Sequence, residues 1–88
     1  MENIIQSNKN IIFTYVLQTF RELYDKNTQQ YYSVEEFFDL FANRCYNSAK
    51  INDVIGLIFT MYYAHFLVRC EVLENGKNVA KYKYNPKV

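Results

Sequence analysis

The 88-residue chain has no tryptophan, one proline, two glycines and two cysteines, and its formal net charge is only +1. Two cysteines, Cys45 and Cys70, are too few for a disulfide framework, so we expect buried thiols. The small net charge argues against general electrostatic binding to nucleic acid and leaves room for a local basic patch. Half of the residues are hydrophobic, so we expect one domain over residues 1–88 with a core that needs no cross-links.

Sequence features of several other protein classes are also missing. No signal-peptide pattern precedes Ile11, so we expect a cytoplasmic protein. The main apolar segment, residues 54–68, is shorter than the roughly 20 residues that a membrane span needs. There is no phosphate-binding loop, and a metal site built from Cys45, His65 and Cys70 would lack a fourth ligand. His65 has no serine or cysteine nucleophile in a recognisable context, so we expect neither an enzyme nor a cofactor.

Residues 48–65 have helical spacing and organise the rest of the chain. Ser48 is the expected N-cap, because its hydroxyl can accept a bond from a free amide of the first turn. One face, at steps of three and four residues, is expected to be core: Ile51, Val54, Ile55, Ile58, Met61, Tyr62 and His65.

The opposite side of this helix carries a second stripe, where a solvated helix would carry charges. Its members are Asn52, Gly56, Phe59, Thr60 and Tyr63. A fully enclosed core helix and a partner surface both explain this stripe. We favour the partner surface, because Gly56 lets two helix backbones approach while Phe59 and Tyr63 supply apolar contact. The stripe therefore predicts a homodimer.

Residues 66–84 alternate in the way that β-strands do, on either side of Asn75-Gly76. This dipeptide is typical of a two-residue type I′ turn, because both residues tolerate positive φ. Such a turn predicts the register of the hairpin: Glu74 opposite Lys77, Val72 opposite Val79, Cys70 opposite Lys81, Arg69 opposite Tyr82 and Leu67 opposite Tyr84.

Two further helices are expected before the central one. Residues 8–26 carry a wide apolar stripe, and residues 1–7 before them form either a short strand or an arm. The second helix begins with a capping box, in which Ser33 is the N-cap and Glu36 lies three residues on, and it ends near Asn43.

The order of these elements over residues 8–87 resembles the winged helix-turn-helix family. That order is two helices, a turn, a third helix and then a hairpin with a basic turn. The resemblance implies an α+β fold of three helices with a C-terminal β-hairpin wing. It also implies that the start of the third helix enters the major groove and that the wing contacts the DNA backbone or minor groove. Lysine suits phosphate and asparagine suits adenine edges. The candidate DNA-binding residues are Asn47, Ser48, Lys50 and Asn52 on the helix, and Lys77, Asn78, Lys81 and Lys83 on the wing.

Gly56, Phe59 and Tyr63 depart from an ordinary winged-helix protein, which would place basic or amide side chains there. A dimer joined through the third helices is similar to the TubR-type adaptors of tubulin-like plasmid and phage partition systems. That resemblance implies a homodimer on double-stranded DNA, with a tubulin-like GTPase as a further partner. We expect a role in DNA partition, as a centromere-binding adaptor, or in transcriptional repression. The alternative is a protein-interaction module on the same scaffold, such as a phage-encoded inhibitor of a host complex, which the near-neutral charge and acidic second helix favour.

Overall fold

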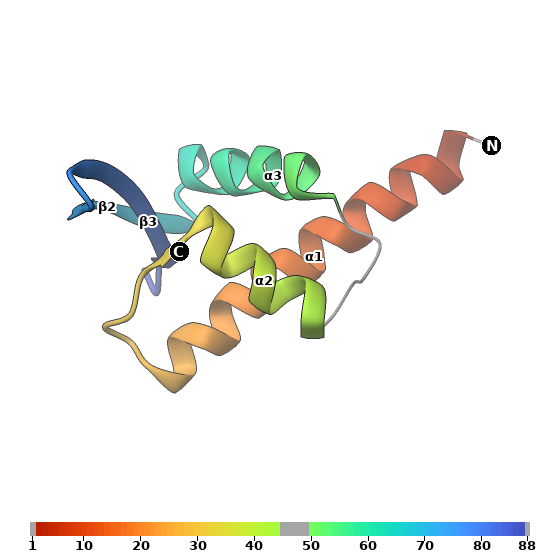
Figure 1. Ribbon diagram of the computed structural model, residues 1–88. Coiled ribbons are helices and arrows are strands. Elements are labelled where there is room, and N and C mark those ends of the chain that lie inside the picture. Colours follow the sequence, from red (N-terminus) through yellow and green to blue (C-terminus); the bar gives the residue numbers. More distant parts are fainter. Residues whose placement is uncertain (1, 45–49, 88) are drawn as a thin grey trace.

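The computed structural model describes residues 2–44 and 50–87, which form three helices and one three-stranded antiparallel sheet (Figure 1). The expected α+β class with a C-terminal hairpin is confirmed. No helix among the described residues is both long and apolar enough to cross a membrane. In chain order the elements are α1 (Glu2–Lys26), β1 (Tyr32–Ser33), α2 (Val34–Arg44), α3 (Ile51–Tyr63), β2 (Leu67–Glu74) and β3 (Lys77–Tyr84).

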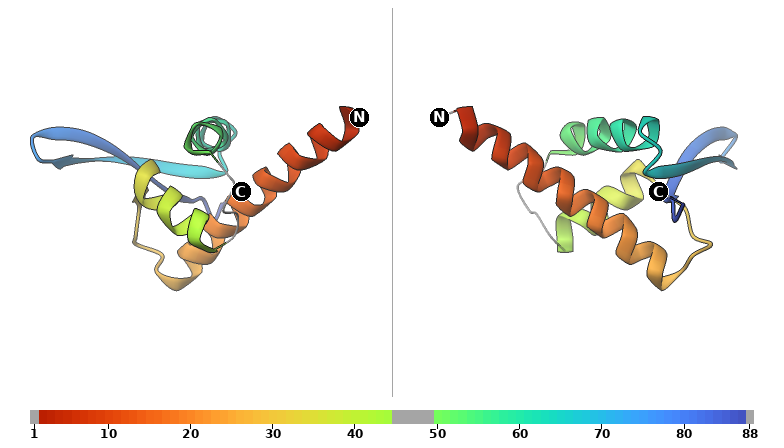
Figure 2. Two further views of the ribbon diagram at one scale, coloured as in Figure 1. Left: turned by 45° about the vertical axis from the view of Figure 1, so that its right-hand side comes forward. Right: turned by 180° about the vertical axis from the view of Figure 1, so that it is seen from behind.

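Helix α1 is longer than the sequence predicted. It begins at Glu2, so residues 2–7 belong to a helix, and of the two alternatives given for this segment the short strand is excluded. The physical reason is that no glycine or proline interrupts the first 26 residues, so nothing in the local sequence ends the helix between residues 7 and 8. Both views in Figure 2 show the N-terminal end of α1 extending away from the other elements.

The capping box at the start of α2 is confirmed. The backbone amide of Ser33 donates to Oε1 of Glu36 at 2.8 Å, and the backbone amide of Glu36 donates to Oγ of Ser33 at 3.1 Å. Two amides that the helix cannot satisfy internally are thereby bonded. The Ser33 amide, followed by Lys81, holds the pKa of Glu36 below its ordinary value.

This lowered pKa predicts an acid-sensitive contribution of Glu36 to stability. The contribution is complete above the pKa of an unfolded glutamate and disappears as the pH falls through the lower native-state pKa. Glu36→Gln removes the titration while glutamine still accepts the Ser33 amide. We expect the free energy of unfolding, measured in urea from about pH 6 to pH 3, to fall more steeply for the wild type than for Glu36→Gln. Parallel curves would contradict the assignment.

Strand β1 was not predicted from the sequence. It pairs with β3 through Tyr32 opposite Tyr82 and Ser33 opposite Lys81, which gives the sheet the order β1-β3-β2. Two residues are too few to show the alternation of a strand. The pairing attaches the hairpin to the start of α2.

Helix α3 is shorter than the expected segment of residues 48–65. Its N-cap is Lys50, which makes no side-chain capping bond, and the proposed N-cap Ser48 lies outside the described residues. At the other end His65 has a φ of 68°, a left-handed conformation that ends a helix. His65 is exposed, so its expected place on the buried face is wrong, and Ile51 is exposed as well.

The core lies where the three helices meet the base of the hairpin. Phe20 of α1 and Phe37 of α2 stack at its centre, with 3.8 Å between ring centroids and 4° between ring planes. Burying a side chain of this size contributes about 1.5–3 kcal/mol. The buried apolar residues are Val16, Phe20, Leu23, Phe37, Phe41, Val54, Ile58, Met61, Leu67 and Tyr82.

The hairpin has the predicted register at all five pairs. Asn75 and Gly76 both have positive φ, 52° and 78°, as a type I′ turn requires. Leu67 and Tyr82 are buried at the base of the hairpin, whereas residues 71–78 at its outer end are all exposed. The hairpin therefore protrudes from the body of the protein beyond the C-terminal end of α3 (Figure 1).

Candidate nucleic-acid interface

The tip of the hairpin presents two of the predicted DNA-binding residues to solvent. Lys77 and Asn78 follow the turn directly, and both are exposed. Lys77 lies opposite Glu74 in the register, but Glu74 makes its ion pair with Lys81 instead. The ammonium group of Lys77 is in a position to reach a phosphate that approaches the tip.

The start of α3 presents a second pair, Lys50 and Asn52, and both are exposed. The free amides and the dipole of a helix N-terminus add a partial positive charge there. Asp53 in the first turn opposes that charge. Asn47 and Ser48, the other two candidates, lie outside the described residues.

The structure does not bring these two pairs together within one chain. The hairpin leaves the C-terminal end of α3, so the tip and the start of α3 lie at opposite ends of this part of the molecule (Figure 1). A single copy therefore offers two small, separated polar and basic sites and, over the described residues, no continuous basic surface between them.

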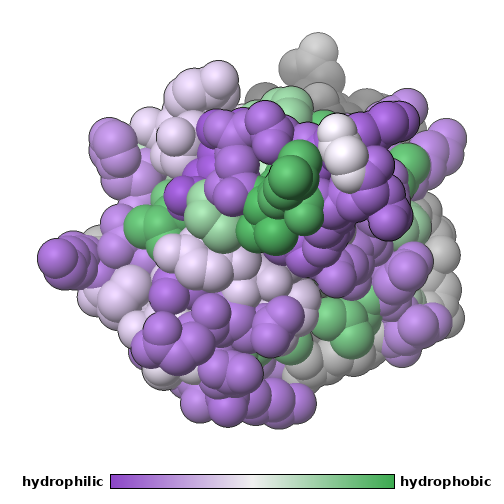
Figure 3. Space-filling model, turned by 60° about the vertical axis from the view of Figure 1, so that its left-hand side comes forward, coloured by the Kyte–Doolittle hydropathy of each residue, from purple (hydrophilic) through white to green (hydrophobic). Residues whose placement is uncertain are grey.

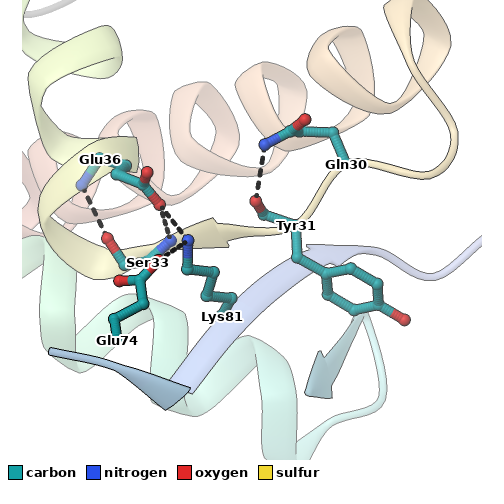
Figure 4. Close-up of polar contacts among 6 residues, drawn as sticks. All are labelled: Gln30, Tyr31, Ser33, Glu36, Glu74 and Lys81. Atoms are coloured by element: carbon teal, nitrogen blue, oxygen red, sulfur yellow. Dashed lines mark hydrogen bonds and ion pairs between the residues drawn. The ribbon is translucent and has the colours of Figure 1, made fainter. Parts of the chain in front are cut away.

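Lys81 is held against the protein surface by two half-exposed carboxylates (Figure 4). Its Nζ lies 2.9 Å from Oε2 of Glu74 and 3.3 Å from Oε1 of Glu36, and only 12% of its side chain is exposed. The hydrogen bond to Glu74, followed by the hydrogen bond and charge of Glu36, raises the pKa of Lys81. Its charge is balanced within the chain before any DNA arrives.

Lys83 is also engaged within the chain. Its Nζ donates to the backbone carbonyl of Thr28 at 2.7 Å and lies 4.6 Å from the ring centroid of Tyr31 and 5.8 Å from that of Tyr24. Ammonium groups at such distances from an aromatic face are attracted by the ring. These contacts connect β3 to the loop that follows α1. The ammonium groups of Lys81 and Lys83 are thus engaged by partners within the chain, whereas the other two predicted wing residues lie at the exposed tip.

The second stripe of α3, called the outer stripe from here on, is open to solvent in the single chain. Its members are Asn52, Gly56, Phe59, Thr60 and Tyr63. Phe59 is 46% exposed and Tyr63 is 76% exposed, so an α3 enclosed on both sides is excluded. A Cβ added to Gly56 would meet nothing within 4 Å. Thr60, also exposed, donates its hydroxyl to the carbonyl of Gly56 at 2.9 Å, which leaves this part of the stripe flat and small.

Two grooves border this stripe. One, of about 410 Å³, lies toward α1 and is lined by Ile12, Asn52, Asp53, Gly56, Leu57 and Thr60. The other, of about 360 Å³, lies toward the hairpin and is lined by Val34, Phe59, Tyr62, Tyr63, Arg69, Ala80 and Tyr82. The stripe itself thus contributes to both grooves: Asn52, Gly56 and Thr60 line the first, and Phe59 and Tyr63 line the second.

The groove toward the hairpin includes residues that sequence reasoning did not assign to a site. The rings of Tyr62 and Tyr82 meet edge to face at 5.9 Å between centroids. The guanidinium of Arg69 lies 3.8 Å from the carboxylate of Glu71. The alternation of β2 and β3 places Arg69 and Tyr82 on one face of the hairpin, but it does not indicate that α3 lies beside them.

Over the described residues, the face that carries the hairpin has no single large apolar patch (Figure 3). Figure 3, seen with the hairpin side toward the reader, shows hydrophobic side chains in small separate patches among hydrophilic ones. Within residues 2–44 and 50–87 no group of three His, Cys, Asp or Glu side chains is arranged to hold a metal ion. Comparison of the chain with protein-family models, with curated proteins and with solved structures finds no match in any of the three.

Proposed function

We propose that this protein is a winged helix-turn-helix DNA-binding protein that acts as a homodimer, in plasmid or phage DNA partition as a centromere-binding adaptor or in transcriptional repression. The observation that carries the proposal is a hairpin that follows α3 directly and presents Lys77 and Asn78 at an exposed tip. In winged-helix proteins these two elements are the ones that meet the major groove and the adjacent backbone.

The outer stripe of α3 supports the dimer. Phe59 and Tyr63 are large, exposed and apolar over most of their surface, and aromatic side chains of this kind are enriched in protein interfaces. Gly56 has open space above it, so a second helix can approach closely there. The proposed pairing joins two copies through Gly56, Phe59, Thr60 and Tyr63. Lys50 and Asn52 at the start of α3 lie outside this pairing, and they and both hairpin tips stay free for DNA.

The dimer also compensates for the small number of cations in each chain. Lys50 and Lys77 of two copies would supply about four phosphate contacts, which is a modest number for a DNA-binding protein. Asn52 and Asn78 would supply hydrogen bonds to base edges. Affinity would come from Lys50 and Lys77 together, and selectivity from the two asparagines.

The test is the salt dependence of binding to duplex DNA from upstream of the gene and to a random duplex of equal length. We expect the double variant Lys50→Ala with Lys77→Ala to bind every sequence more weakly. Its log–log salt slope should fall by roughly 0.9 for each phosphate that is no longer neutralised, or about 3 to 4 per dimer. Lys26→Ala, which removes an exposed lysine at the end of α1, is the matched control and should leave the slope unchanged. A wild-type protein that binds neither duplex at low salt would overturn the proposal.

One observation favours the alternative of a protein-interaction module. The cations of Lys81 and Lys83 are engaged within the chain, while α2 presents the exposed carboxylates of Glu35 and Asp39. An acidic helix face repels phosphate and attracts basic protein surfaces. Pull-down of one stoichiometric protein partner without DNA would favour this function. Recovery of a tubulin-like GTPase together with DNA would favour partition.

A further inference from the structure

We propose that Lys81 is a positioning residue that fixes the wing, the hairpin of β2 and β3, against the start of α2. Lys81 itself contacts no phosphate, and it supports DNA binding by keeping the wing in its orientation. The part of this inference that concerns DNA rests on the proposed function. The part that concerns the wing stands on the contacts of the single chain.

The backbone alone attaches the wing to the helices only weakly. Strand β1 contributes two residue pairs to β3, and the second of them is Ser33 opposite Lys81. Beyond that pair the remaining residues of the hairpin, through Glu74 and Lys77, pair only with each other. A two-stranded hairpin without further packing is marginally stable in water. Leu67 and Tyr82 bury the base of the hairpin in the core, so it is the direction of the outer part that depends on side chains placed near the last β1 pair.

Lys81 occupies that place. It leaves β3 beside Ser33 and reaches Glu36 of α2 on one side and Glu74 near the end of β2 on the other (Figure 4). Glu36 is already oriented, because its Oε1 accepts the Ser33 amide in the capping box. The carboxylate of Glu36 thus both caps α2 and binds Lys81 of the wing. Through Glu74, the same lysine also binds the outer end of β2.

Charge balance holds the ammonium of Lys81 beside these two carboxylates. The groups facing it are two carboxylates, and both raise its pKa, Glu74 first. The nearest lysine along β3, Lys83, directs its own ammonium to the carbonyl of Thr28. Moving Lys81 to a phosphate would leave Glu36 and Glu74 without their cation beside a polyanion, which is electrostatically unfavourable.

The first experiment measures the wing without DNA. Amide hydrogen exchange of β1 and β3 is compared between the wild type, Lys81→Gln, Lys81→Arg and the control Lys77→Gln. We expect Lys81→Gln to speed exchange several-fold in both strands, Lys81→Arg to restore wild-type protection, and Lys77→Gln to have no effect. Unchanged exchange in Lys81→Gln would overturn the positioning role.

The second experiment measures DNA binding of the same variants as a function of salt. Lys77→Gln should lower the salt slope by roughly 0.9 for each phosphate that the lysine neutralises in the wild type. Lys81→Gln should weaken binding with no change of slope, and Lys81→Arg should restore affinity. A slope lowered equally by Lys81→Gln and Lys77→Gln would make Lys81 a phosphate ligand and overturn the inference. If the wild type binds no DNA, the proposed function fails and hydrogen exchange alone decides the positioning role.

Discussion

Phe59→Lys is expected to convert a dimer of this protein into monomers. Sedimentation should report about twice the chain mass of 10.6 kDa for the wild type and about 10.6 kDa for the variant at the same concentration. The physical reason is that Phe59 lies near the middle of the outer stripe of α3, where an ammonium group would be buried in apolar contact. Central interface residues of this kind typically cost about 2 kcal/mol or more on replacement, or about 30-fold in dissociation constant.

Leu40→Lys is the matched control for this experiment. Leu40 is 37% exposed on the surface of α2, close to the 46% of Phe59, so the two variants place the same charge at similar exposure on different helices. We expect Leu40→Lys to remain a dimer. A wild type that sediments as a monomer at high concentration, or a folded Phe59→Lys that remains a dimer, would exclude an interface through α3.

Phe37→Ala is expected to have the largest effect on stability. Phe37 is fully buried, stacks on Phe20 at 3.8 Å and contacts Phe41 with 5.8 Å between centroids, so it joins α2 to α1. Truncating a buried phenylalanine costs about 3–5 kcal/mol, because apolar burial decreases and a cavity remains. A chain of this size has a total stability of roughly 4–13 kcal/mol. Urea unfolding should therefore show a variant that is barely folded.

The control for Phe37→Ala lies two residues along the same helix. Asp39 is exposed, and Asp39→Ala should change the free energy of unfolding by no more than about 0.5 kcal/mol. If Phe37→Ala cost less than about 1 kcal/mol, the aromatic stack would not be the centre of the core. Near-ultraviolet circular dichroism would show independently whether the aromatic side chains still pack in a fixed arrangement.

The parts of the fold that were predicted from the sequence are the parts that depend on neighbouring residues. Asn75-Gly76 determines the turn, and the turn determines the register of the hairpin through Leu67 and Tyr84. Ser33 and Glu36 determine the start of α2. In each case a few adjacent residues contain the whole physical reason, so no knowledge of distant contacts was needed.

The parts that were missed depend on contacts between distant residues. Strand β1 exists because Tyr32 and Ser33 lie beside β3, which comes much later in the chain. For the same reason, Lys81 was expected to be a free wing lysine, although Glu36 and Glu74 hold it. Alternation predicts that Lys81 shares a face with Val79, but it does not indicate which helix lies over that face.

The structure decides one question about the candidate site that the sequence left open. The second stripe of α3 was identified from the sequence as either enclosed or available to a partner, and the exposure of Phe59 and Tyr63 decides against enclosure within one chain. The sequence pattern of one chain does not indicate which molecule covers the stripe, because that depends on contacts between molecules. Lys50, Asn52, Lys77 and Asn78 have the exposure that contact with DNA requires.

The short link after α3 has a consequence for how two wings could be spaced. His65 adopts its left-handed conformation there, and Asn85 braces it by donating its side-chain amide to the carbonyl of His65 and its backbone amide to the carbonyl of Phe66, both at 2.9 Å. Two hydrogen bonds thus stabilise the bend between α3 and β2. In a dimer joined through α3, this bend would set the distance between the two hairpin tips. DNA repeats at any other spacing would have to bend in order to contact both tips.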